Sequence, residues 1–255
     1  METGATNPSQ LLLRWDGSVV QWSSMQNGGD GSPVWSYGSR EIRRQNMLPE
    51  VVQFLHSRFK TVENISFTRR YLSATMIPSI VVESNLEAAE NWYKLHNSPN
   101  EEVALRIQHL DSIDTQPLII ESGDTAWENA VTNSFPQAAR ISQQASLLKS
   151  AVASSRKNSK WVVYVDAGDK GADIVSAKNG VPCYIGATNS GLTDSMLYNI
   201  VNAMHRDGLK PGDVQVCLMG EGADELSESM RRFFEEVEIL GGGDSKWFGL
   251  KVISE

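Results

Sequence analysis

The sequence predicts an α/β fold with a mostly parallel sheet that ends in an antiparallel hairpin. Short apolar runs of strand length alternate with helical patterns along most of the chain, as in consecutive βα units. Residues 80–91 and 118–129 resemble each other, and each segment has the pattern of a strand, a serine and a helix. The last two apolar runs are separated only by GGGDS, which is too short for a crossover and therefore predicts antiparallel pairing.

The composition is that of a globular protein. Of 255 residues, 40% are hydrophobic and 21% are charged with both signs interspersed, which excludes a disordered chain. No run approaches the roughly 18 apolar residues of a membrane span, and the start does not resemble a signal peptide. We therefore expect no membrane association and a cytoplasmic location. The net charge of −8 disfavours non-specific binding to RNA.

Residues 1–75 are predicted to form an N-terminal extension made of a hairpin and a helix. An Asp-Gly turn lies between apolar runs within residues 11–24, which is typical of a β-hairpin. A helical pattern runs from about Arg40 to Phe59. Pro49 favours the start of a second helix within this pattern, because the first turn of a helix tolerates proline.

Two groups of residues in this extension leave alternatives open. The tryptophans Trp15, Trp22 and Trp35 either anchor a core or form a surface for a protein partner. The densest group of arginines forms either a solvated face around two helix ends or an RNA-binding surface. Its members are Arg40, Arg43, Arg44, Arg69 and Arg70.

Residues 76–255 are predicted to form one domain. The run WVVYVD at residues 161–166 is apolar almost throughout and predicts a strand that is buried on both faces. Further elements are predicted from periodicity and from turn residues. In order they are a strand near 138–142, a helix containing Ala145 to Val152, a strand at 172–177, a helix at 192–204, a strand at 213–220, a helix at 223–234 and closing strands at 235–240 and 246–254.

Several of these segments resemble the class I S-adenosylmethionine-dependent methyltransferases. PLIIESGDTAW at residues 117–127 is similar to the first strand and glycine-rich turn of that family, and VVYVDAGD at 162–169 is similar to its third strand. LKPGDVQVCLMG at 209–220 resembles the entry into the fifth strand. The resemblance covers about residues 116–254. It implies a Rossmann-like fold and a methyltransferase, or a methyltransferase-like subunit that has lost activity, with S-adenosylmethionine as the small-molecule cofactor.

The same resemblance implies the residues of the cofactor site. Glu121 or Asp124 would contact the methionine or ribose end, and Gly123, the one glycine retained of the family's three, would admit the backbone. Asp166 or Asp169 would contact the adenine or ribose. These residues would share one crevice at the carboxyl ends of the strands. No residue is assigned a catalytic role, and no metal site is predicted from the resemblance.

A second hypothesis uses the acidic residues of the C-terminal half. Strands at 161–166, 172–177 and 182–187, followed by a helix, a strand and a helix, also match a ribonuclease H-like order. In that arrangement Asp166, Asp194 and either Glu221 or Asp224 would converge and hold two Mg²⁺ ions. This alternative predicts a metal-dependent nuclease or an inactive relative, although acidic residues at strand ends are also common helix caps.

Overall fold

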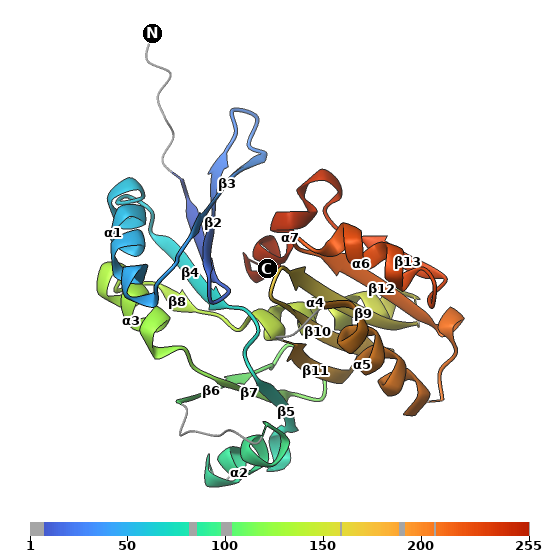
Figure 1. Cartoon of the computed structure of the whole chain (residues 1–255). Helices are drawn as coiled ribbons and strands as arrows, with labels where there is room; N and C mark the ends of the chain where they lie inside the picture. The colour runs from blue at the N-terminus through green and yellow to red at the C-terminus, as the bar shows by residue number, and fades with distance from the viewer. Residues whose placement is uncertain are drawn as a thin grey trace.

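The protein contains two large mixed sheets and one small antiparallel sheet (Figure 1). The computed structural model describes residues 8–81, 86–97, 104–158, 160–188, 192–206 and 208–254. The α/β class is confirmed, but the mostly parallel Rossmann-like sheet is wrong. In each large sheet the three strands that come first in the sequence pair antiparallel with one another, and the two later strands pair parallel with their neighbours.

Sheet A forms the first half of the molecule and has the strand order β3-β2-β1-β4-β8. Its strands are β1 (Gln10–Trp15), β2 (Val19–Asn27), β3 (Pro33–Glu41), β4 (Asn64–Arg69) and β8 (Ala139–Arg140). Two helices, α1 (Leu48–Arg58) and α3 (Thr125–Ser134), contribute to the hydrophobic core on one face of this sheet. The hairpin predicted within residues 11–24 is confirmed by the antiparallel pairing of β1 and β2.

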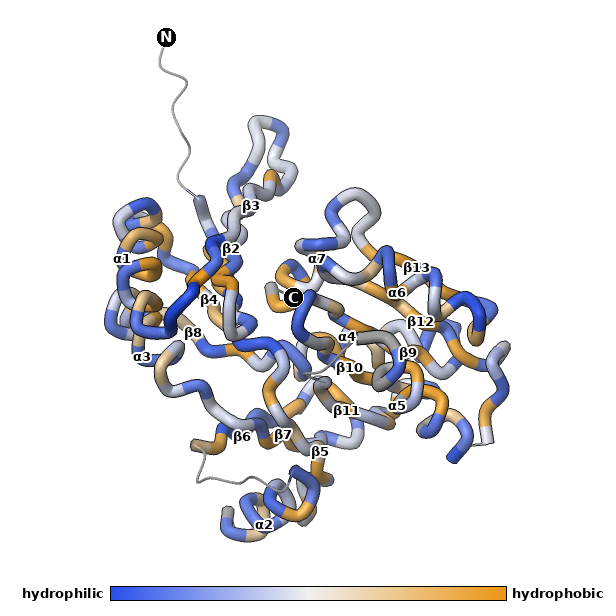
Figure 2. The backbone as a smooth tube through the Cα atoms, in the orientation of Figure 1, coloured by the Kyte–Doolittle hydropathy of each residue, from blue (hydrophilic) through white to orange (hydrophobic). Residues whose placement is uncertain are grey.

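Sheet C forms the second half and has the strand order β11-β10-β9-β12-β13. Its strands are β9 (Trp161–Gly168), β10 (Gly171–Lys178), β11 (Val181–Thr188), β12 (Val214–Met219) and β13 (Glu236–Ile239). The helices α5 (Leu192–Arg206) and α6 (Ala223–Met230) contribute to the core on one face. The strand predicted at 161–166 is confirmed and fully buried, and Figure 2 shows apolar colouring along β12 beside it.

The two halves repeat one topology and are interlocked by their last helices. In each half three antiparallel strands, a helix, a parallel strand, a second helix and a further parallel strand follow in the same order. Helix α4 (Gln143–Asn158) follows β8 but packs on β9 and β10 of the other half. Helix α7 (Ser245–Lys251) follows β13 and contacts β1 and β2. Each half therefore contributes a helix to the other.

The third sheet, sheet B, is an insertion between β4 and α3. It has the order β5-β7-β6, with both pairs antiparallel. Its elements are β5 (Ala74–Pro78), α2 (Leu86–Asn97), β6 (Leu105–His109) and β7 (Pro117–Ser122). The boundary predicted between residues 75 and 76 falls inside β5. Short 3₁₀ turns complete the described chain, at η1 (Gln45–Met47), η2 (Ser79–Val81), η3 (Pro211–Asp213), η4 (Gly242–Asp244) and η5 (Val252–Ser254).

Two predicted local structures are wrong. The closing antiparallel hairpin is not formed, because β13 pairs parallel with β12 and residues 245–251 form helix α7. Gly241 and Gly242 both have positive φ, so the chain turns there into a helix instead of a returning strand. In the first of the two similar segments Ile80 lies in a 3₁₀ turn and not in a strand, and residues 82–85 lie outside the described residues.

None of the described helices is both long enough and apolar enough to cross a membrane.

Candidate functional site at the junction of the two large sheets

Equivalent positions of the two halves meet at a buried junction and carry opposite charges. Arg14 on β1 pairs with Gln21 on β2 and with Thr68 on β4. Asp166 on β9 has the equivalent position, since it pairs with Asp173 on β10 and with Met219 on β12. Successive side chains of a strand point to opposite faces of its sheet. The side chains of Arg14 and Asp166 lie on the faces that meet at the junction, called the inner faces below.

Asp166 is the centre of this junction. Its Oδ2 accepts hydrogen bonds from Arg14 Nη1 at 2.7 Å and from Gln143 Nε2 at 3.0 Å, and its Oδ1 accepts one from Arg70 Nη2 at 2.9 Å. Both arginine side chains and the carboxylate are fully buried. Arg14, Arg70 and Asp166 together carry a net charge of +1. A further anion is expected nearby, because an unpaired buried charge is destabilising.

Glu221 supplies this balance. It follows Met219 by two residues, just as Arg70 follows Thr68, and its Oε2 lies 3.1 Å from Arg70 Nη1. Gln21 also donates a hydrogen bond to Glu221. Burial raises the pKa of Glu221, but the two arginines outweigh this effect and lower the pKa overall. Burial alone would lower the pKa of Arg70, whereas Asp166 and the other acidic groups raise it, so Arg70 remains charged.

Asp173 pairs with Asp166 on the neighbouring strand but contacts different groups and has a raised pKa. It accepts the backbone N–H of Tyr71, at 3.0 Å from Oδ1, and Gln144 Nε2 at 3.0 Å. Complete burial raises its pKa to about 7, against the opposing effects of the Gln144 hydrogen bond and of Arg70. With Asp173 protonated, the junction contains two cations and two anions. Tyr71 has a φ of 60°, a conformation that its hydrogen bond to Asp173 helps to hold.

Glycines allow the two halves to approach this closely. A Cβ atom on Gly249 of α7 would collide with the Asp166 carboxylate and lie 2.8 Å from Arg14 Nη1. A Cβ on Gly168 would collide with the Tyr71 hydroxyl of the first half. Within the second half, a Cβ on Gly220, which has a φ of +93°, would collide with the Ala167 carbonyl oxygen. Side chains and backbone therefore fill the space between the strand ends.

The residues predicted for the cofactor turn lie elsewhere. Glu121 is the last residue but one of β7 in sheet B, where Arg140 and Ser142 donate hydrogen bonds to its carboxylate and burial raises its pKa. Asp124 is the N-cap of α3 and accepts the N–H of Trp127. Gly123 donates its N–H to a backbone carbonyl. Glu121 and Asp166 are thus in different sheets, and the shared crevice is not formed. Binding of S-adenosylmethionine by these residues stays a prediction.

The acidic residues of the nuclease hypothesis do not converge. Asp194 is exposed on α5 and Asp224 is exposed in the first turn of α6, while Asp169, which was predicted for the cofactor site, is exposed in the turn between β9 and β10. Only Asp166 and Glu221 meet, through Arg70. Within the described ranges, no group of three or more His, Cys, Asp or Glu side chains is placed to hold a metal ion.

The tryptophans and arginines of the N-terminal part are also separated. Trp15 and Trp22 belong to the core of sheet A, and Trp35 packs partly against α7. Arg70 is buried, whereas Arg40 is exposed on β3, so the arginine group is not one surface. The junction residues Arg14, Gln143, Gln144 and Asp173 were not predicted. The sequence does contain a signal for Arg14 and Asp173, since each is a charged residue within an apolar run, LLLRW for Arg14 and ADIVSA for Asp173.

The fold is that of the actin-like ATPases. The chain is similar to a Bacteroides thetaiotaomicron protein with an actin-like ATPase fold and unknown function, at 16% identity and a TM-score of 0.77, over 99% of this chain and 97% of that one. PilM of the PilM–PilN type IV pilus biogenesis complex has 11% identity and a TM-score of 0.60, over 96% and 97%. The ethanolamine utilization protein EutJ from Carboxydothermus hydrogenoformans has 10% sequence identity and a TM-score of 0.52, over 96% of this chain and 88% of that one.

These similarities correct the predicted function. Almost the whole chain superimposes on actin-like folds, so the predicted methyltransferase, active or inactive, is wrong. The strand order that suggested a ribonuclease H-like domain is present, but the nuclease function drawn from it has no support. None of the curated proteins matches the sequence significantly.

The fold name implies ATP as a ligand, and the charges at the junction do not fit its phosphates. Ligands of open α/β sheets lie outside the carboxyl ends of the strands, which here is the junction. Arg14 and Arg70 at the junction are fully buried and paired with Asp166 or Glu221. A triphosphate would have to displace these carboxylates and would meet Asp173 as well.

The turns at the strand ends offer few donors to a phosphate. In the turn after β1, Asp16 Oδ1 accepts the N–H groups of Ser18 and Val19, both at 2.7 Å. In the turn before α6, the N–H groups of Gly220 and Gly222 donate to backbone carbonyl oxygens. Some buried polar atoms at the junction have no protein partner among the described residues. They are Arg14 Nη2, Arg70 Nε, Tyr71 Oη, Gln143 Oε1 and Gln144 Oε1.

A family model described as a protein of unknown function matches residues 47–237, about three quarters of the chain. This match extends from helix α1 through sheet B to strand β13 and includes Arg70, Asp166, Asp173 and Glu221. The chain therefore belongs to the DUF3822 family.

Proposed function

We propose that this protein is a partner-binding scaffold on an actin-like fold that neither binds nor hydrolyses ATP. The observation that carries the proposal is the junction, where Arg14 and Arg70 are buried and bound to carboxylates of the same chain. Arg14 and Arg70 are both bonded to Asp166, and no side-chain surface of either is exposed.

The energetics of the junction favour a closed molecule. Separation of the two halves would break the ion pairs of Asp166 with Arg14 and Arg70, all three of which are buried. Breaking one partner of a buried ion pair typically costs about 3–5 kcal/mol. A ligand that separates the halves would have to offset a cost of this order before it gained any contact. A fixed relative placement of the halves suits a protein that presents surfaces more than one that opens and closes during turnover.

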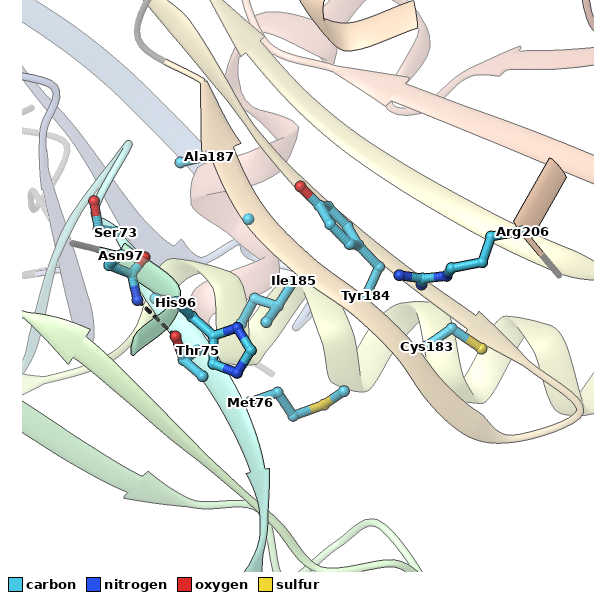
Figure 3. Close-up of a pocket in the computed structure, with 12 residues that line it drawn as sticks. Ser73, Thr75, Met76, His96, Asn97, Cys183, Tyr184, Ile185, Ala187 and Arg206 are labelled. Carbon is cyan, nitrogen blue, oxygen red and sulfur yellow. Dashed lines mark hydrogen bonds between the residues drawn. The ribbon is translucent and has the colours of Figure 1, made fainter. Parts of the chain in front are cut away.

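The partner-binding part of the proposal rests on a relative and on the insertion. PilM, which has the same fold, occurs in a complex with the protein PilN. In the present chain, sheet B and helix α2 project from the first half (Figure 1). Helix α2 exposes the side chains of Trp92 and Leu95. The Trp92 ring stacks on His96, which lines a groove between β5 and β11 (Figure 3). Exposed apolar residues beside a groove are typical of protein-binding surfaces.

Isothermal titration calorimetry of the full chain with MgATP tests the proposal. We expect only heat of dilution, and an unchanged melting temperature in millimolar MgATP. A nucleotide present at 100 times its Kd would stabilise the fold by about 2.7 kcal/mol, which is easily measured. Magnesium chloride without nucleotide is the matched blank. Saturable heat with MgATP alone, or release of inorganic phosphate above the blank, would contradict the proposal.

A further inference from the structure

A pocket of about 500 Å³ lies between the first half and helix α4, at the opposite end of β1 from the charged junction. Gln10 at the start of β1 lines this pocket, whereas Arg14 at the junction is near the end of the same strand. The four residue steps between them span roughly 13 Å in an extended strand. The pocket is therefore a site separate from the junction.

The inner face of sheet A forms one wall of the pocket. Side chains alternate between the faces of a strand, so Gln10 shares a face with Leu12. Ser66 on β4 pairs with Leu12 and lies on the same face. Gln108 on β6 of sheet B borders the pocket beside them, and its Oε1 accepts the N–H of Ser142 at 3.1 Å. Two sheets thus contribute polar side chains to this wall.

Helix α4 forms the opposite wall. Its side chains at the pocket are those of Ser146, Lys149, Ser150 and Ala153. Positions spaced by three, four and seven residues lie on one face of a helix. The apolar residues of α4 pack on β9 and β10 of the second half. The polar groups that face the pocket are therefore not needed for the packing of the helix.

Several of these polar groups have no partner within the protein. Among the described residues, the side chains of Gln10 and Ser66 have no hydrogen-bond partner. Within the same ranges the hydroxyl of Ser146 has none either, although this residue is only 9% exposed. Lys149 is exposed at the mouth of the pocket and forms no ion pair with any described residue. Because an unpaired polar group in a buried position is destabilising, these side chains favour a ligand that supplies partners.

The charge of the lining indicates which chemical group would bind. In the part of the chain that the structure describes, the lining contains one cation, Lys149, and no carboxylate. A carboxylate carries one negative charge and is balanced by one lysine. A phosphate monoester carries a charge of about −1.5 to −2 near neutral pH and would need a second cation. A single carboxylate is therefore the group that matches this lining.

The rest of the lining indicates the body of the ligand. Ile141, Val252 and Ile253 contribute apolar side chains, and Ala153 adds a small apolar side chain from α4. Apolar surface favours contact with hydrocarbon over contact with water. The pocket also lies within the range of about 300–1,000 Å³ that is typical of small-molecule sites. These features favour a ligand whose carboxylate is attached to a short hydrocarbon body.

We propose that this pocket binds a small organic acid, with its carboxylate at Lys149 and its hydrocarbon body against Ile141 and Ile253. The hydroxyl of Ser146 would donate a hydrogen bond to the carboxylate. Gln108 is bonded to the helical turn that precedes Ser146, so its amide nitrogen is placed to donate a second one. This site goes beyond the proposed partner binding and does not depend on it.

Saturation-transfer difference NMR of the full chain tests the inference, with hexanoate, octanoate and benzoate as probes. We expect at least one of these acids to give a saturable signal. The amide of the same acid has nearly the same shape without the charge, and it should bind at least about tenfold more weakly, because hydrogen bonds to charged groups are stronger than those to neutral ones. Hexyl phosphate should bind no more tightly than hexanoate.

Three variants localise the site. Lys149→Gln removes the cation and should weaken the acid at least about tenfold while it leaves the amide unaffected. Ala153→Phe fills the pocket from α4 and should abolish binding of the acid. Lys157→Gln is the matched control, because it removes the same charge from the same helix outside the pocket, and it should bind as the unaltered chain does. Equal melting temperatures of the variants separate loss of binding from loss of fold.

Three results would overturn the inference. They are the absence of a saturable signal with all three acids, an unchanged affinity of either pocket variant, and tighter binding of hexyl phosphate than of hexanoate, which would assign the pocket to phosphate esters. MgATP titration reports on the junction, and the acids report on the pocket. Heat from MgATP with an intact acid site would therefore reject the ATP-independent scaffold alone, whereas absence of both signals would reject only the acid site.

Discussion

Sheet A and sheet C share one topology but differ in the charge of their inner faces. The first half places Arg14 and Arg70 at the junction, and the second half places Asp166 and Glu221 at the equivalent positions. Neither half could bury its own charges alone, because each set has one sign. A repeated fold can therefore become a single unit when equivalent positions acquire opposite charge.

Removal of Asp166 should have the largest effect. Asp166→Ala leaves Arg14 and Arg70 buried with Glu221 as their remaining ionised partner, so we expect the free energy of unfolding to fall by about 3–5 kcal/mol. Urea denaturation followed by circular dichroism measures this loss.

The matched control for Asp166 is its neighbour in the next turn. Asp169 is exposed, so Asp169→Ala should change the free energy of unfolding by less than about 0.5 kcal/mol. Equal losses for both substitutions would show that the junction does not depend on its central carboxylate.

Asp173 should give the junction a pH dependence of intermediate size. Its pKa is about 7 in the folded protein and near 3.8 in the unfolded chain, so the folded state holds the proton more tightly. The stabilisation is complete below pH 4 and is lost as the pH rises to 7, with a slope of at most about 1.4 kcal/mol per pH unit.

Asp173→Asn tests this effect, since the amide oxygen can still accept the N–H of Tyr71. We expect urea denaturation between pH 4 and pH 7 to show a flatter profile for the variant, with the largest gain over the unaltered chain at pH 7. A variant whose profile runs parallel to that of the unaltered chain would assign the pH dependence to other groups.

The smallest effect concerns a second contact between the halves. Tyr37 on β3 stacks on Trp247 of α7, with ring centroids 5.2 Å apart, and Lys251 lies over the Tyr37 ring. Trp247→Phe keeps a stacked ring and should cost less than about 1.5 kcal/mol. Thermal unfolding should remain a single transition, because the charged junction still joins the halves. Two resolved transitions would mean that stacking, and not charge, holds them together.

Local pattern predicted much of the secondary structure but not the direction of pairing. The apolar run of β9 and the hairpin of β1 and β2 were predicted because each carries its signal in a few adjacent residues. The antiparallel turn between β10 and β11 was missed, although Asn179 and Gly180 both have the positive φ that an Asn-Gly hairpin turn requires. Helix α7 was missed because its apolar residues also fit a short strand.

The site was harder to predict for a physical reason. Arg14 and Asp166 are 152 residues apart, and a buried ion pair leaves no local pattern in the sequence that could link its members. A charge within an apolar run indicates that some partner exists, but not which one. Asp166 was predicted to contact a ligand because it lies near the end of a strand, and its neighbours in the structure are Arg14 and Arg70.

The separation of Arg14 from Asp166 has a consequence for synthesis on the ribosome. At about 5–20 residues per second, Asp166 is made roughly 8 to 30 s after Arg14. During that interval β1 to β4 can pair, but their inner face holds two cations with no counterion. Helix α4 is still missing at first, and α7 arrives last of all. The inner face of the nascent first half therefore remains exposed to water until the second half has left the exit tunnel.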